Sequence, residues 1–299
     1  MKPSEVSKRL ACLVPARLPV LLVGPPGVGK SEVVAQACAA ANVQCEVFHP
    51  AVSDPTDYKG LPALVDGKAE FLPYGDLRSL LKAQTPTVAF LDDLGQAPAA
   101  VQAAAMQLIL GRRVNGFRLP DTVTFIAASN RREDKAGVTG ILEPVKSRFA
   151  TILEVTADLD DWCTWAFSAN LPVEVIAFLR FRPALLHDFK ATADLVNSPC
   201  PRTWAHAGRL VNLGLTDLDT LAGAVGQGAA TELVAFLRVY RSLPSIDGIL
   251  LNPDTAKVPT DPSALYAVAV ALAARASDQT AERIIKYATR LPAEFQVLC

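Results

Sequence analysis

The sequence predicts an α/β domain built on a parallel sheet, followed by a helical domain. Three observations favour this fold class. A glycine-rich loop lies between an apolar run and a helix-like segment, further apolar runs recur as far as Val155, and helical patterns broken by proline and glycine fill the rest of the chain. The expected boundaries are 1–156 for the α/β domain, with its N-terminal helix, and 157–299 for the helical domain.

The composition excludes several classes of protein. The chain has 299 residues and a formal net charge of −1, so no overall basic balance indicates nucleic acid or an anionic membrane as a partner. No apolar run reaches the roughly 18 residues of a membrane span. The six cysteines are scattered and form no C-x-x-C pair, which argues against structural zinc. Reduced thiols fit a cytoplasmic location best.

The glycine-rich loop is the most specific motif. Gly24-Pro25-Pro26-Gly27-Val28-Gly29-Lys30-Ser31 matches G-x-x-x-x-G-K-[ST] completely. Glycines let the backbone turn tightly and aim its N–H groups at phosphates, and a helix N-terminus favours their negative charge. We expect these residues and the following Glu32 to bind nucleotide, with Lys30 on the β- and γ-phosphates and Ser31 on Mg²⁺.

The elements around this loop follow from periodicity. Pro3–Val14 and Ser31–Ala41 have apolar residues at helical spacing, and Val20–Val23 and Gln44–Phe48 have the character of strands. Ala63–Phe71 resembles two short strands around the turn Asp66-Gly67. The alternative for this insert is an ordinary surface loop.

The strand predicted at Thr87–Leu91 runs directly into Asp92 and Asp93. In parallel sheets, ligands bind at the carboxyl ends of the strands. One carboxylate there can orient the water shell of Mg²⁺, and the next can polarise an attacking water. We assign these roles to Asp92 and Asp93 respectively; the alternative is a simple helix cap.

The rest of the α/β domain follows the same pattern. Ala97–Leu110 is expected to be a helix, Thr122–Ala128 to be a buried strand and Ile152–Val155 to be the last strand. Arg112–Pro120 contains Asn115-Gly116, a strong hairpin signal. Its three arginines form a basic tip, which is either a solvated surface or a binding site.

From Asp92 onward the sequence resembles MoxR-type ATPases of the AAA+ superfamily of P-loop NTPases. The motifs that carry the resemblance are 92–98, Gln102, the hairpin 111–120, Ala127-Ala128-Ser129-Asn130, 142–149 and Pro201-Arg202-Thr203-Trp204, preceded by an insert at 57–73. Their order agrees over residues of about 18 to 205. The resemblance implies an AAA+ core with a parallel five-stranded sheet, followed by a helical lid.

The resemblance also implies ATP and Mg²⁺ as cofactors and a homo-oligomeric ring, usually a hexamer. Asn130 would contact the attacking water or the γ-phosphate, and Arg148 would reach a neighbouring subunit's site as an arginine finger. Arg202, in the lid, would contact phosphate in its own subunit. The alternatives are a strand-end cap for Asn130 and surface ion pairs for both arginines; Lys146 and Arg131 are competitors for the finger.

One departure concerns Asp93, where most AAA+ proteins carry Glu. Its carboxylate sits back by roughly 1 Å, and such a displacement can cost on the order of 100-fold in rate. We therefore expect slow hydrolysis. The resemblance implies, as the leading function, a chaperone ATPase that remodels or assembles a protein, and members of that family commonly work with a partner bearing a von Willebrand factor A domain.

Two alternatives stay open: an ATP-binding switch with little hydrolysis, and a nucleic-acid motor or loader based on the basic tip. Tyr58, Phe71 and Phe117 are candidates to grip a polypeptide, and each is also a candidate packing residue.

Overall fold

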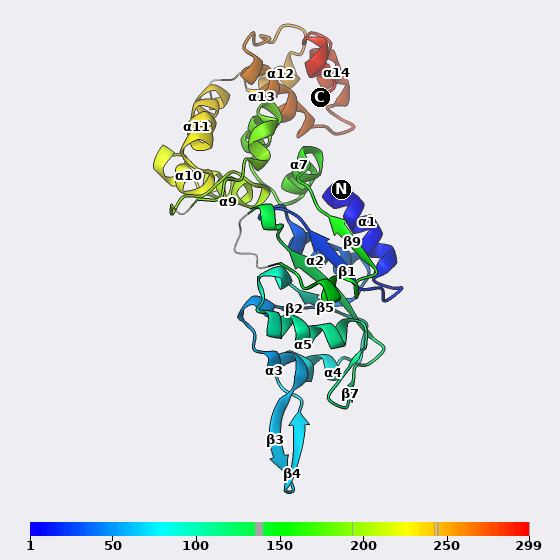
Figure 1. The fold of residues 1–299 in the computed structure, drawn as a ribbon. Coiled ribbons are helices and arrows are strands. Elements are labelled where there is room, and N and C mark those ends of the chain that lie inside the picture. Colours follow the sequence, from blue (N-terminus) through cyan, green and yellow to red (C-terminus); the bar gives the residue numbers. More distant parts are fainter. Residues whose placement is uncertain (135–139, 193, 242, 244, 299) are drawn as a thin grey trace. The chain divides into compact units, whose positions relative to one another are not determined.

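A computed structural model describes residues 1–134, 140–192, 194–241, 243 and 245–298. The chain divides into two compact units, Met1–Thr156 and Ala157–Cys299. The first unit combines helices with a sheet, and the described part of the second contains helices and loops (Figure 1).

Five parallel strands form the central sheet of the first unit in the order β2-β5-β8-β1-β9 (Figure 1). Their bounds are β1 Val20–Val23, β2 Gln44–Phe48, β5 Thr87–Leu91, β8 Val123–Ser129 and β9 Thr151–Glu154. Every residue of β5 and β8 is buried, which explains why their sequences do not alternate between apolar and polar residues. The predicted parallel five-stranded sheet is confirmed. Because the strands are parallel, all five end at one edge, where polar side chains gather.

Helices cover the sheet and bury its apolar side chains. Those of the first unit are α1 Pro3–Leu13, α2 Lys30–Ala40, α3 Pro55–Lys59, α4 Gly75–Leu81, α5 Ala99–Ile109 and α6 Glu143–Lys146. On one face, α3 to α6 enclose a core that includes Leu21 of β1, Ala89 of β5 and Ala127 of β8. Helices α1 and α2 pack against each other. The sheet thus has a buried core on this face, from which the loops at its carboxyl edge extend.

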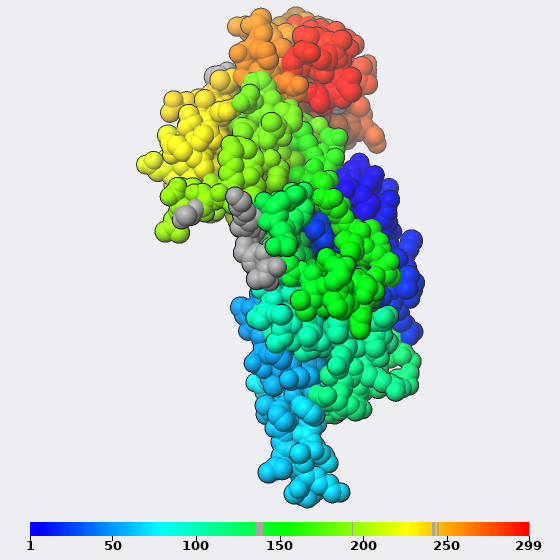
Figure 2. Space-filling model, viewed as in Figure 1, coloured from blue at the N-terminus to red at the C-terminus, as the bar shows by residue number. Residues whose placement is uncertain are grey.

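Two hairpins extend from this core. The first consists of β3 Leu61–Val65 and β4 Lys68–Leu72, and the second of β6 Arg113–Val114 and β7 Phe117–Arg118. Both turn residues of each hairpin have positive φ, as a tight two-residue turn requires: 49° and 77° at 66–67, and 45° and 87° at 115–116. Both predicted hairpins are confirmed. In Figure 2 the first hairpin, in cyan, stands clear of the rest of its unit.

Side chains on and near the hairpins refine two expectations. Tyr58 is only 1% exposed and belongs to the core, so it is a packing residue and the idea that it grips a polypeptide is wrong. Phe71 is 38% exposed. Arg112 donates to the carbonyl oxygens of Val123 and Pro120 at 2.8 and 2.5 Å, and burial lowers the pKa of its guanidinium. It therefore anchors the base of the second hairpin, and the basic tip is reduced to Arg113 and Arg118.

The second unit is built from helices around two hydrophobic clusters. Its helices are α7 Leu159–Ser168, α8 Val173–Phe181, α9 Pro201–Asn212, α10 Leu218–Val225, α11 Gln227–Arg241, α12 Ile246–Leu251, α13 Pro262–Ala273, α14 Ala281–Ala288 and α15 Ala293–Gln296. One cluster centres on Trp204 and Phe178, whose ring centroids are 5.5 Å apart, and the other on Tyr287 and Phe295. Across the described residues, no helix has the length and apolar character to span a bilayer.

Candidate nucleotide-binding site

The phosphate loop connects β1 to α2. Gly27 and Gly29 have φ values of 75° and 95°, and Gly29 is the residue that precedes the first helical turn. Residues with side chains rarely adopt these angles, so the two glycines permit the turn. Gly24 serves a different purpose: a side chain there would collide with the carbonyl oxygen of Val155. The loop, which also contains Pro25, Pro26 and Val28, thus leads its backbone into the N-terminus of α2.

Lys30, the first residue of α2, is 7% exposed. Its Nζ donates to the carbonyl oxygens of Gly24 and Pro25 at 2.8 and 3.0 Å and to Oδ1 of Asn130 at 2.7 Å. Asn130 directly follows β8, and β8 pairs with β1 so that Ser129 lies beside Val23. A buried ammonium needs such oxygen partners. The neighbouring strands therefore deliver the amide of Asn130 to the lysine.

Ser31 and Asp92 form the second contact of the site. The Ser31 hydroxyl donates to Oδ2 of Asp92 at 2.8 Å. Asp92 follows β5, and its backbone N–H donates to the carbonyl of Phe48 at 2.9 Å, which fixes it against β2. Hydroxyl and carboxylate oxygens are the hard ligands that Mg²⁺ prefers, directly or through water. The donor set present here therefore fits Mg²⁺.

Asp93 is bonded to one residue of each of the two contacts just described, Lys30–Asn130 and Ser31–Asp92. Its φ is 55°, in the left-handed region, where Asp and Asn are tolerated better than most residues. Its N–H donates to Oδ1 of Asp92 at 3.1 Å, and Nδ2 of Asn130 lies 3.4 Å from its Oδ1. Asn130 thus presents its carbonyl oxygen to Lys30 and its amino group to Asp93. One amide connects the cation of the phosphate loop with the second acid.

The structure brings five of the predicted site residues together: Lys30, Ser31, Asp92, Asp93 and Asn130. Chemically, the arrangement offers a cation and helix N-terminus for phosphates, oxygen ligands for Mg²⁺ and a carboxylate that can polarise water. Glu32 lies in the first turn of α2 and accepts a hydrogen bond from Gln36 at 2.9 Å, so its carboxylate is engaged along the helix.

The two predicted arginines lie outside this group. Arg148 follows α6, is partly exposed, and donates to the carbonyl of Pro144 at 3.1 Å. Arg202 is the second residue of α9 in the second unit, and its side chain is exposed. Neither forms an ion pair with any residue that the structure describes.

The two competitors for the finger are both engaged in ion pairs. Arg131 makes a two-pronged contact with Asp134 at 2.8 and 3.0 Å and also reaches Glu133 and Glu154, and these acids raise the pKa of its guanidinium. Lys146 pairs with Glu143 at 2.7 Å. Of the three candidates, Arg148 therefore has the least engaged side chain.

Gln102 contributes more than the sequence indicated. It is 1% exposed, and its amide donates to the carbonyls of Ala97 and Gly140 at 3.1 and 2.9 Å. Its Oε1 accepts the N–H of Leu142 at 3.0 Å. Gln102 thus fastens the start of the Arg148 segment to α5. Its occurrence in the resemblance was the signal, but two of its three partners, Gly140 and Leu142, lie 38 and 40 residues away.

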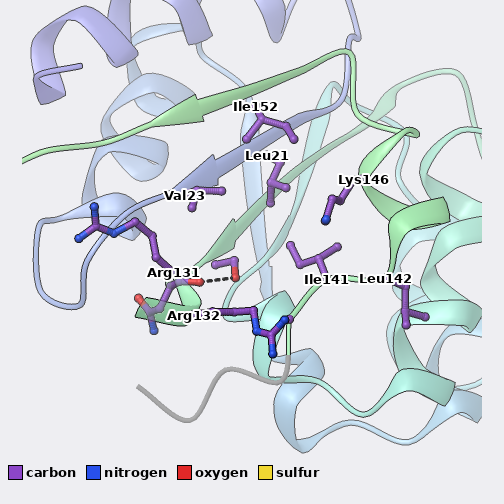
Figure 3. A pocket seen from close by; sticks show the side chains of 11 residues that line it. Leu21, Val23, Arg131, Arg132, Ile141, Leu142, Lys146 and Ile152 are labelled. Atoms are coloured by element: carbon purple, nitrogen blue, oxygen red, sulfur yellow. Dashed lines mark hydrogen bonds between the residues drawn. The ribbon is translucent and has the colours of Figure 1, made fainter. Parts of the chain in front are cut away.

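A pocket adjoins Asn130 on the face of the sheet near α6 (Figure 3). Its volume is about 400 Å³. Leu21, Val23 and Ile152 supply apolar walls from β1 and β9, and Arg132 and Lys146 supply positive charge (Figure 3). No sequence signal indicated this cavity, because its walls come from strands at the two ends of the unit's sequence.

Comparisons with known proteins give a family match over part of the chain and distant similarity to solved structures. Residues 19–149 match the model of the AAA domain, dynein-related subfamily. The RuvB Holliday junction branch migration motor of Thermotoga maritima is 16% identical, with 94% of this chain and 86% of that chain covered and a TM-score of 0.44. NtrX from Brucella abortus, in complex with ADP, is 14% identical, with coverage of 99% and 68% and a TM-score of 0.49. None of the curated proteins compared matches the sequence. Residues 19–149 thus match the model of an AAA domain, and with the complete phosphate loop and the five-stranded parallel sheet they have the AAA+ P-loop fold.

Proposed function

We propose that this protein is an ATP-hydrolysing ring ATPase that remodels or assembles a protein partner. The observation that carries the proposal is a set of hydrogen bonds at the carboxyl edge of the sheet. The amide of Asn130 contacts both Lys30 and Asp93, and the hydroxyl of Ser31 donates to Asp92. Hydrogen bonds thus connect a lysine for the phosphates with a candidate base through Asn130, and this base adjoins a pair of metal ligands; ATP hydrolysis needs all three.

The roles follow from the chemistry of each group. Lys30 and the loop N–H groups bind the phosphates, and Ser31 and Asp92 hold Mg²⁺, which offsets the charge of the phosphates. Asp93 accepts the proton of the attacking water. Asn130, which touches both Lys30 and Asp93, orients that water and senses the γ-phosphate.

Assembly into a homo-oligomeric ring, most simply a hexamer, would complete the site. Arg148 is partly exposed and has the least engaged side chain of the three candidates, as a residue that acts on a neighbour needs to have. Its charge would stabilise the transferring phosphoryl group. We assign Arg202 to phosphate contact from the helical unit, in keeping with its exposed position at the start of α9.

Within AAA+ proteins we assign the chain to the MoxR type, acting in the cytoplasm as a chaperone with a partner that bears a von Willebrand factor A domain. Two hairpins, at 61–72 and 113–118, support this assignment because their places in the chain agree with the resemblance. Exposed apolar residues on the first hairpin, such as Leu64 at 80% and Phe71 at 38%, suit contact with a protein client.

A second candidate is an ATP-binding switch that hydrolyses little. It is favoured by Asp93, whose carboxylate is one methylene shorter than that of Glu and lies 3.4 Å from Nδ2 of Asn130. Phosphate release by the full chain with ATP and Mg²⁺ separates the two. Turnover that requires Lys30 supports the ATPase; tight ATP binding without turnover, with or without the partner, supports the switch. Absence of ATP binding would overturn both.

A further inference from the structure

The side chain of Gln102, which is 1% exposed, lies between two segments of the first unit. On one side its amide nitrogen donates to the carbonyl of Ala97 at 3.1 Å. On the other side the same nitrogen donates to the carbonyl of Gly140 at 2.9 Å, and Oε1 accepts the N–H of Leu142 at 3.0 Å. The N–H of Gly140 also donates to the carbonyl of Gly95 at 3.2 Å. Gln102 and this backbone hydrogen bond therefore hold the two segments together.

The first of these segments is the loop that follows Asp93, and Asp93 has anchors of its own. Its N–H donates to Oδ1 of Asp92 at 3.1 Å, and its carbonyl accepts the N–H of Gln96 at 2.9 Å. Nδ2 of Asn130 lies 3.4 Å from its carboxylate. The position of the acid therefore does not depend on Gln102 alone, and the loop is a fixed base to which the other segment is attached.

The second segment leads through α6 to Arg148. The N–H of Arg148 donates to the carbonyl of Val145 at 3.1 Å, so the backbone of the arginine follows the position of α6. Val145 is fully buried, whereas Leu142, which precedes the first turn of α6, is 37% exposed. Packing thus holds the middle of the segment, and the hydrogen bond to Gln102 holds its start. Without Gln102, α6 would keep its packing and lose this attachment.

We propose that Gln102 is a positioning residue for Arg148. The inference rests on the proposed function, in which Arg148 acts on the phosphates of a neighbouring subunit. The hydrogen-bond partners of Gln102 are not residues of the candidate nucleotide site, so it acts on the reaction through the segment it holds. A displacement of about 1 Å can cost on the order of 100-fold in rate. Loss of Gln102 should therefore impair a subunit that supplies the arginine more than one that receives it.

The test separates these two roles in mixed rings. A Lys30→Ala subunit binds ATP poorly and can only supply Arg148, whereas an Arg148→Ala subunit can only receive it. Gln102→Met, which removes the amide, is added first to the supplying subunit and then to the receiving one. We expect phosphate release to fall by about 10–100-fold in the first mixture and to stay at the level of the unmodified mixture in the second. A merely structural role would lower both alike.

Two further variants make the result specific. Gln107→Met changes an exposed glutamine on the same helix and should leave both mixtures unchanged. Gln102→Glu keeps an oxygen for the N–H of Leu142, and a buried carboxyl stays protonated, so it can donate to one carbonyl. Its effect in the supplying subunit should lie between those of the native glutamine and Gln102→Met. This variant carries the comparison if Gln102→Met does not fold.

The outcomes distinguish the positioning role from the proposed function. Equal losses in the two mixtures, or no loss when the supplying subunit carries the change at Gln102, would overturn the positioning role and leave the ATPase standing. No turnover by the wild-type chain would overturn the proposed function, and the positioning role with it. The same holds if the unmodified mixture stays inactive while native mass spectrometry shows mixed rings, because Arg148 would then not act on a neighbour.

Discussion

The Nζ of Lys30 and the Oδ1 of Asn130 lie 2.7 Å apart, although one hundred residues separate them in the sequence. The contact exists because β1 and β8 are neighbours in register, so the residues that follow them emerge side by side. With the carbonyls of Gly24 and Pro25, Asn130 gives the ammonium three oxygen partners. A phosphate that binds Lys30 must therefore displace or join these oxygens, and Asn130 is placed to respond to it.

Replacing Lys30 with Ala should strongly weaken nucleotide binding. Hydrogen bonds to charged groups contribute about 1.5–3 kcal/mol each, so loss of one or two phosphate contacts predicts a fall in ATP affinity of at least about tenfold. Titration with a fluorescent ATP analogue measures this. Lys68→Ala, which removes an exposed lysine from the first hairpin, is the matched control and should bind normally. Equal affinity in the two variants would remove Lys30 from the site.

The Ser31–Asp92 pair predicts a metal effect. Asp92→Asn keeps the size of the side chain but removes the negative charge beside the serine hydroxyl. We expect the Mg²⁺ concentration for half-maximal turnover to rise by about 10–100-fold, the usual cost of losing a residue that supports a metal site. A magnesium titration at fixed ATP measures it, with Asp66→Asn on the exposed hairpin turn as control. An unchanged magnesium requirement would contradict the assignment.

The sequence predicts the sheet and the phosphate loop well because their signals are local. Lys30 and Ser31 belong to one short motif, and Asp92 and Asn130 each end an apolar run. Contacts between residues that are far apart in the sequence have no such local signal. The amide of Gln102 is satisfied by residues such as Gly140, and a pattern of single residues cannot reveal that geometry.

The sequence pattern also gives a wrong expectation for one arginine, and the reason is physical. Arg112 looked like part of a basic tip, yet the chain folds back so that two carbonyl oxygens receive its guanidinium. These contacts depend on the direction of the turn, which spacing alone does not specify.

Asp93 should be tested with two replacements. Asp93→Asn keeps the shape and tolerates the left-handed backbone, but it cannot accept a proton, so turnover should fall by about 10²–10⁴ with ATP binding retained. Asp93→Glu restores reach but places a residue less suited to a φ of 55°, so we expect a loss of stability of about 1 kcal/mol. Phosphate release and urea unfolding measure the two effects. Equal turnover in all three proteins would show that Asp93 is not the base.

Gln102→Leu should destabilise the first unit. The substitution removes three hydrogen bonds and leaves the buried carbonyl of Ala97 without its Gln102 partner. An unsatisfied buried polar group costs about 1–3 kcal/mol, so we expect a loss of unfolding free energy of about 3 kcal/mol in urea. Gln107→Leu, at an exposed position on the same helix, is the control and should change stability by less than about 0.5 kcal/mol. Similar losses in both variants would mean that the hydrogen bonds of Gln102 contribute nothing to stability beyond the packing of the helix.

Arg148→Ala should abolish turnover without affecting nucleotide binding by the same chain, because the guanidinium is expected to act on a neighbouring subunit. An arginine finger is worth about 10³–10⁵ in rate, so the loss should fall in that range. Arg9→Ala is a matched control: Arg9 also donates to the carbonyl four residues earlier, at 3.2 Å compared with 3.1 Å for Arg148. It should turn over ATP normally.

Mixing subunits distinguishes action on a neighbour from action within one chain. A Lys30→Ala subunit cannot bind ATP well but carries Arg148, whereas an Arg148→Ala subunit has an intact Lys30 but supplies no finger. Each is inactive alone, yet in a mixed ring an Arg148→Ala subunit can receive the arginine of a Lys30→Ala neighbour. Phosphate release should therefore reappear on mixing and depend on the ratio of the two proteins. If every mixture stays inactive while native mass spectrometry shows mixed rings, Arg148 acts within its own chain or only supports the fold, and the site does not need a neighbour to be complete.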